Sequence, residues 1–128
     1  MYFIKLFFII LAIYIPVSCV QEADVQDQQV SDNGKASSLI DGQKLYAKLC
    51  AGCHGRGGKG TKQGPPLIHK IYEPSHHNDA SFYRAVKKGV QAHHWQFGNM
   101  PPIENISDSD MSTIIFYVRH QQRKVGIK

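Results

Sequence analysis

Residues 50–54 read Cys-Ala-Gly-Cys-His, and this motif constrains the fold more than any other part of the chain. It brings Cys50, Cys53 and His54 together in a sequence whose only other cysteine is Cys19. Three cysteines cannot form the disulfide framework on which many small secreted domains depend. The motif is therefore expected to serve another chemistry.

Four kinds of site use two cysteines at this spacing. A structural zinc site needs four ligands, usually as two separated pairs, and the chain has no second cysteine pair. A thioredoxin-type redox pair needs a strand–helix–strand setting, and a plain disulfide would leave His54 unexplained. The fourth is covalent haem attachment, for which Cys-x-x-Cys-His is the signature. Cys50 and Cys53 can then form thioethers with the two vinyl groups of one haem, and His54 lies beneath the iron.

The first nineteen residues predict export. Lys5 precedes an apolar run from Leu6 to Val17, which is shorter than the roughly 20 residues that a membrane-spanning helix needs. A basic start, a short apolar stretch and a small-residue end are typical of a signal peptide. Residues 1–19 are interpreted as a signal peptide or lipoprotein signal, and the mature chain is expected on the periplasmic side of a bacterial membrane.

Cys19 has three alternative fates. Val17 and Ser18 precede it as small residues do in a lipoprotein signal, although Pro16 stands where that pattern prefers leucine. A lipid on Cys19 would tether the chain to a membrane. Otherwise the cysteine is discarded with the signal, or the N-terminal segment remains as a short uncleaved anchor.

Charge divides the rest of the chain into two segments. Residues 20–39 are rich in Gln, Asp and Ser, have a net charge of −3, and predict a flexible acidic tether because they offer little apolar surface to bury. Residues 40–128 have a net charge of +7. An exported basic domain is expected to meet an acidic protein partner or an anionic membrane surface rather than nucleic acid.

Residues 40–128 predict an all-α domain of three main helices joined by long loops. The apolar periodicity places these helices at about Asp41–Cys50, Asp79–Lys88 and Asp108–Arg123. Asn78 and Ser107 are suitable N-caps for the second and third helices. A core of this size is marginal by itself, so a bound group is expected to fill its centre.

Two loops carry further information. The glycine-rich stretch at residues 55–64 is not a phosphate-binding loop, because Lys59 is followed by Gly60 instead of Ser or Thr and no strand precedes it. Near residue 100, Met100 stands directly before Pro101 and Pro102. The two prolines prevent regular helix and favour an extended backbone that presents the methionine.

With these motifs in order, most of residues 40–128 resembles the class I c-type cytochromes. The likeness lies in "DGQKLYAKLCAGCHG", in "GPPL", in "GNMPPI" and in "IIFYVR" of the last helix. The resemblance implies a mono-haem cytochrome c fold wrapped around one covalently bound haem c with its iron. It also implies that Gly42 and Tyr46 on the first helix meet Tyr117 on the last.

The resemblance also implies roles for three residues outside the Cys-x-x-Cys-His motif. Met100 would be the second axial ligand of the iron opposite His54; its alternative role is core packing, which better explains the rival Met111. The carbonyl of Pro65 would accept a hydrogen bond from His54 and fix the ring, unless the proline only makes a rigid turn. Trp95 would pack on the haem edge and donate to a propionate, or be a buried aromatic without such a role.

Other polar residues allow alternatives to these assignments. Histidine pairs compete with Met100 for the iron, but paired histidines in polar loops are expected to be solvated: His76 with His77, and His93 with His94. His69 and His120 are interpreted as surface residues. Four lysines could rim the haem edge as a docking surface or simply form a solvated face: Lys59, Lys62, Lys87 and Lys88.

These expectations predict an electron-transfer protein rather than an enzyme, although a subunit of an oxidoreductase complex is compatible with them. An iron closed by His54 and Met100 has no position for a substrate and favours the ferrous state. The resemblance implies a quinol-oxidising complex as donor and a terminal oxidase or peroxidase as acceptor. The alternative is a haem-based ligand-binding or sensor domain in which Met100 is displaced.

Overall fold

The computed structural model describes the backbone of residues 23–128 and the side chains of residues 32–128. This part of the chain is helical, with short 3-10 turns and one isolated β-bridge between Val90 and Met100. The elements in order are α1 (Ala23–Leu49), α2 (Ala51–His54), η1 (Arg56–Gly58), η2 (Lys70–Tyr72), α3 (Asp79–Lys88) and α4 (Asp108–Lys124). The all-α class expected from the sequence is confirmed.

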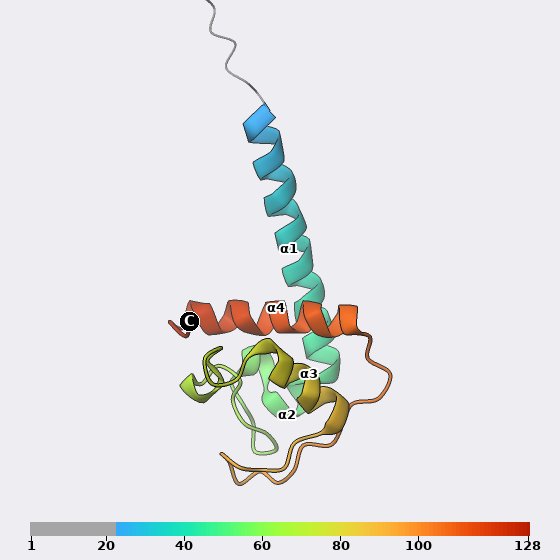
Figure 1. The fold of residues 1–128 in the computed structure, drawn as a ribbon, viewed down its shortest axis with the longest axis vertical. Coiled ribbons are helices and arrows are strands. Elements are labelled where there is room, and N and C mark those ends of the chain that lie inside the picture. Colours follow the sequence, from blue (N-terminus) through green and yellow to red (C-terminus); the bar gives the residue numbers. More distant parts are fainter. Residues whose placement is uncertain (1–22) are drawn as a thin grey trace, which may run out of the picture.

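Helix α1 crosses helix α4, and this crossing organises the domain (Figure 1). The point of closest approach on α1 is a glycine. A Cβ at Gly42 would lie 2.8 Å from the Tyr117 Cβ and closer still to the Thr113 carbonyl oxygen, so the two backbones approach as only glycine allows. One turn later the Tyr46 ring lies against the Tyr117 ring, with centroids 5.3 Å apart. The expected meeting of Gly42 and Tyr46 with Tyr117 is confirmed.

The first helix begins much earlier than the sequence predicted. The helix expected from about Asp41 starts at Ala23, so most of the segment interpreted as a flexible tether is helical in the structure. Residues 32–38 are all exposed, so this part of the helix buries no apolar face. The sequence therefore has no apolar periodicity there from which a helix could be predicted. At its other end the helix stops at Leu49, and Cys50 separates it from α2 instead of ending it.

Helices α3 and α4 have nearly the predicted bounds, and their N-caps form as expected. The Asn78 side chain accepts a hydrogen bond from the Ser81 backbone N–H, and Ser107 accepts one from Asp110. Gly89, with φ of 73°, ends α3. These caps fix the ends of the loop that runs from residue 89 to residue 107.

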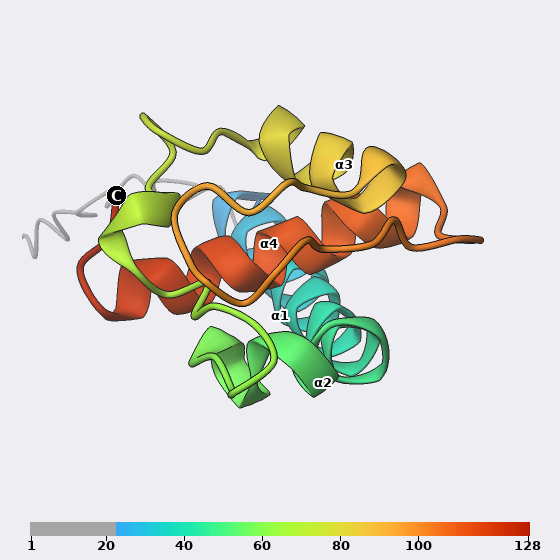
Figure 2. The ribbon, with the colours of Figure 1, turned by 90° about the horizontal axis from the view of Figure 1, so that it is seen from below.

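The apolar core consists of two clusters that share helix α4. The first is made by Tyr46, Leu67, Ile114, Tyr117 and Val118, and Cys50 packs against it. The second is made by Val86, Met111 and Ile115, and Met100 packs against it. Cys50, predicted to attach the haem, and Met100, the predicted second ligand, therefore border different clusters. Both α2 and the 89–107 loop lie on the same side of α4 (Figures 1 and 2).

A buried polar network ties the loop between α2 and α3 to the C-terminal half of α4. Arg119 is only 7% exposed, donates to the carbonyls of Tyr72 and His77, and pairs with Asp79 at 2.8 Å. Gln122, 1% exposed, donates to the carbonyls of Leu67 and Tyr72. Buried carbonyls need such partners, so these two side chains hold a loop that has little regular structure of its own.

Candidate haem site

The motif residues Cys50, Cys53 and His54 lie on one helical turn. The backbone N–H groups of Cys53 and His54 both donate to the Cys50 carbonyl, at 3.2 and 2.9 Å. Both thiols are free, with Cys50 half-buried and Cys53 exposed. This turn presents two thiols and one imidazole next to each other at the end of a helix, as attachment of a single planar group requires.

The glycine-rich loop folds back over this turn. The Gly60 N–H donates to the His54 carbonyl at 2.6 Å, and the Thr61 hydroxyl donates to the Cys53 carbonyl at 2.6 Å. A Cβ at Gly64 would lie 2.9 Å from that same Cys53 oxygen. Gly64 therefore allows the loop backbone to approach the motif closely, and the loop supplies donors for carbonyls that α2 leaves free.

The side chain of His54 is fixed by Pro65. Its Nδ1 lies 2.9 Å from the Pro65 carbonyl oxygen, and because a carbonyl only accepts, Nδ1 carries the proton. The lone pair is then on Nε2, the nitrogen that remains available to a metal. Burial lowers the pKa of His54, while the hydrogen bond to Pro65 acts in the opposite direction. The imidazole is thus neutral at neutral pH and oriented as a ligand.

Cys50 lies in a more apolar environment than its partner. Burial raises the pKa of the Cys50 thiol to about 11, and the adjacent Cys53 adds to the increase. The thiol is therefore protonated at neutral pH, and a protonated thiol is a poor nucleophile. Burial also raises the pKa of Tyr46, whose hydroxyl donates to the Gly55 carbonyl at 3.0 Å and so anchors the end of α2 to α1.

Met100 closes a loop of defined shape. Its backbone N–H and carbonyl both bond with Val90, each at 2.9 Å, and the Asn99 side chain accepts from the Ala92 N–H inside the loop. The half-buried Met100 side chain packs against the cluster that contains Met111, which is itself 3% exposed and serves as a core residue. The backbone of Met100 is thus held in place by Val90, which follows the C-cap of α3.

Trp95 carries the one buried side-chain polar atom without a hydrogen bond among the described residues, its Nε1–H. Its ring lies against His69 and Phe97, with centroids 5.0 and 6.2 Å away. Tyr72 is a polar neighbour of the indole. Burial raises the pKa of Tyr72, and the indole of Trp95 partly offsets that increase. The indole N–H nevertheless makes no hydrogen bond to the Tyr72 hydroxyl. A buried donor without an acceptor is costly and rare, so it indicates an acceptor outside the protein.

The remaining predicted residues, four lysines and six histidines, differ in their exposure and contacts. The four lysines of the expected docking rim are all exposed, but Lys87 is paired with Asp108 at 2.7 Å. His69 is exposed and His120 half-buried. Of the four paired histidines that were expected to be solvated, His77 is half-buried and the other three are exposed, and the two pairs lie together. Sequence reasoning also missed Arg119 and Gln122, whose partners are loop carbonyls far away in the chain.

The donor set fits a covalently attached haem. Two thiols stand one helical turn apart, a neutral imidazole presents Nε2, and a buried indole N–H lacks an acceptor such as a propionate. The fold and site thus define a small all-α protein of the covalent-haem class.

Comparison with known proteins agrees with this class. The family model "Cytochrome c" matches residues 39–122. Cytochrome c-L of Methylorubrum extorquens is 33% identical over 86 residues, which span 66% of this chain and 40% of that protein. The Cbb3-type cytochrome c oxidase subunit CcoP of Azospirillum brasilense is 26% identical over 76 residues, 59% of this chain and 25% of that subunit.

A solved structure gives the same result. Cytochrome cL from Hyphomicrobium denitrificans superposes with a TM-score of 0.52 at 26% identity, over 67% of this chain and 48% of that one. The chain therefore belongs to the cytochrome c family, as a class I c-type cytochrome that binds haem c. It spans less than half the length of the relatives it matches.

Proposed function

We propose that this chain is a one-electron carrier whose haem is held by Cys50, Cys53 and His54. The observation that carries the proposal is the 2.9 Å contact between His54 Nδ1 and the Pro65 carbonyl, which leaves Nε2 of a neutral ring for iron. Cys50 and Cys53 supply the two thioether sulfurs from the same turn. When bound, the haem supplies a reversible Fe(III)/Fe(II) couple.

Met100 is the proposed second axial ligand. The bonds between its backbone and Val90 hold the methionine at a fixed point of the 89–107 loop. Loop closure before binding reduces the entropy lost when the sulfur is immobilised. Histidine and methionine together raise the potential and leave no position for a substrate, so this chain transfers electrons and is not an enzyme.

The proposed partners are membrane redox complexes: a quinol-oxidising complex as donor and a terminal oxidase or peroxidase as acceptor. Similarity to an oxidase subunit, CcoP, supports the second of these. The net charge of +7 on residues 40–128 favours acidic docking surfaces. Lys59 and Lys62, exposed on the loop beside the motif, are proposed to contribute to such a contact.

The proposed location is the periplasmic side of a membrane, reached through the signal at residues 1–19. That signal and Cys19 lie outside the described residues, and none of the described helices is long and apolar enough to cross a membrane. Residues 20–39 are proposed to space the domain from an anchor, and lipid on Cys19 is the proposed attachment. Unchanged membrane fractionation of Cys19→Ser protein would contradict the lipid.

A redox titration tests the central proposal. The haem-loaded protein should follow a single-electron Nernst curve, with a slope of about 59 mV per tenfold change in the ratio of oxidised to reduced protein. The ferrous protein should bind carbon monoxide poorly, because both axial positions are filled. Ready formation of a carbon monoxide complex would favour the ligand-binding or sensor alternative.

A further inference from the structure

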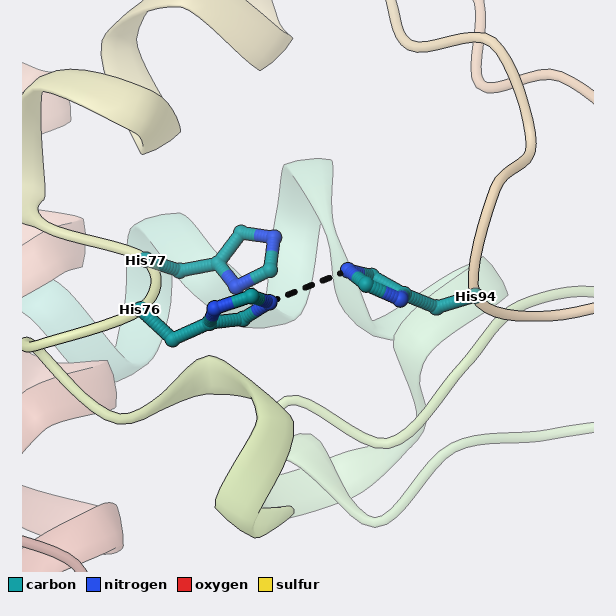
Figure 3. A group of neighbouring side chains, drawn as sticks. All are labelled: His76, His77 and His94. Atoms are coloured by element: carbon teal, nitrogen blue, oxygen red, sulfur yellow. Dashed lines mark hydrogen bonds between the residues drawn. The ribbon is translucent and has the colours of Figure 1, made fainter.

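Four histidines from two separate loops meet at one place on the surface. His76 and His77 lie in the turn before α3, whereas His93 and His94 lie in the loop that Met100 closes. Ring centroids are 5.3 Å apart for His76 and His94, and 4.2 Å for His93 and His94. Figure 3 shows the His94 side chain extending from its loop toward His76 and His77. The side chains thus converge although they come from different segments.

The nitrogens have the separations that a metal ion requires. One ring nitrogen from each of His76, His77 and His94 lies within 4.8 Å of the other two. The Nε2 atoms of His76 and His94 are 3.3 Å apart. Two nitrogen ligands on a tetrahedral zinc ion, with bonds of about 2.0–2.1 Å, are themselves about 3.3 Å apart. One pair of ligand atoms therefore already has the spacing of a metal site, and the third needs only a small movement.

His77 is held in the orientation that a ligand needs. Its Nδ1 donates to the Ile71 carbonyl at 2.6 Å, so Nε2 carries the free lone pair. The backbone carbonyl of His77 accepts a hydrogen bond from the buried Arg119, which fixes the main chain at this position. A second nitrogen bonded to a backbone carbonyl is the usual support of a metal-binding histidine. His93 has a comparable bond, from Nδ1 to the Gln91 carbonyl at 2.8 Å.

We propose that His76, His77 and His94 form a binding site for a divalent transition-metal ion, separate from the haem site. The set contains only imidazole nitrogens, which suit Zn²⁺ and Cu²⁺ and not the oxygen-seeking Mg²⁺ or Ca²⁺. His76 and His94 are exposed, so an ion can enter from solvent. Three protein ligands leave one coordination position of a tetrahedral ion for a fourth ligand, and the centroid of the His93 ring lies 4.2 Å from that of the His94 ring.

The ion would cross-link two loops that already meet through these side chains. His76 and His77 belong to the segment anchored by Arg119, and His94 belongs to the loop that ends at Met100. A metal ion bound by both segments would fix the His94 part of the 89–107 loop to the segment that Arg119 anchors. Binding only to the folded state also raises the unfolding temperature in proportion to the logarithm of the free ion concentration above the Kd.

Calorimetric titration of the haem-loaded protein with Zn²⁺ tests the site. Wild type should take up one ion per chain, and His76→Ala/His94→Ala protein should bind at least ~10-fold more weakly, since loss of even an outer partner of a ligand costs that much. His120→Ala is the matched control, because this histidine lies on α4 outside the cluster, and its affinity should equal that of wild type. Absence of zinc uptake by wild type, or equal affinity in the double variant, would overturn the proposal.

A second measurement does not depend on the variants. In ferrous wild-type protein with ¹⁵N-labelled histidine rings, Zn²⁺ should shift the ring nitrogens of His76, His77 and His94. The ring-nitrogen resonances of His120 should not shift. Shifts confined to His120 or His69 would place the ion elsewhere and refute the site. Both experiments report binding at these histidines, whereas the redox titration and carbon monoxide binding test the proposed function.

Discussion

Replacing Gly42 with alanine tests the close crossing of α1 and α4. The added Cβ would lie 2.8 Å from the Tyr117 Cβ and nearer still to the Thr113 carbonyl oxygen, against 3.4–4 Å for an ordinary contact. The second neighbour is backbone, so the helices must separate. Overpacking of this kind costs about 1–3 kcal/mol, and the better helix propensity of alanine returns about 1 kcal/mol. The expected net loss relative to wild type is therefore at most about 2 kcal/mol, and the loss relative to an alanine that meets no neighbour is about 1–3 kcal/mol.

Denaturant unfolding of the haem-loaded protein, followed by circular dichroism, measures this loss as a shift of the midpoint at constant slope. The matched control is Gly34→Ala on the same helix, where nothing lies within 4 Å of the new Cβ. That variant should be as stable as wild type or more stable, by up to about 1 kcal/mol. If Gly42→Ala were as stable as Gly34→Ala, the helices would not be in close contact at residue 42.

Two further substitutions test contacts that hold the site. Tyr46→Phe should lower the free energy of unfolding by about 0.5–1.5 kcal/mol, since it removes the hydrogen bond to the Gly55 carbonyl; unchanged thermal unfolding would contradict this. Arg119→Met should cost about 1–3 kcal/mol, since it leaves the His77 carbonyl without its donor and leaves the Tyr72 carbonyl with Gln122 as its one remaining donor. Faster hydrogen exchange between residues 67 and 79 should accompany the loss, and unaltered exchange there would argue against the anchoring role.

The elements predicted best from the sequence are those with local signals. Helices α3 and α4 have apolar periodicity together with capping residues, Asn78 and Ser107, and both signals act within a few positions. The crossing at Gly42 was predicted through the family resemblance, because a single glycine in a helix does not identify its partner. The motif at residues 50–54, together with the export signal and an all-α chain too small to fill its own core, predicted haem attachment.

Features that depend on distant contacts were missed. The carbonyls that Arg119 and Gln122 satisfy belong to loop residues without periodicity, so their pairing has no signal in the sequence. The meeting of His76 with His94 likewise depends on how two loops fold. Helix α1 was expected to start near Asp41, because the prediction relied on an apolar stripe and the residues before Asp41 have none. The helix starts at Ala23.

The most direct test of the central claim is the optical spectrum of the ferric haem-loaded protein, compared between wild type and Met100→Ala. The proposal predicts the weak far-red band of methionine sulfur on iron in wild type and its loss in the variant. It also predicts a lower reduction potential for the variant, since methionine ligation raises the potential. A wild-type spectrum without this band, or a band that survives in Met100→Ala, would contradict an iron closed by His54 and Met100.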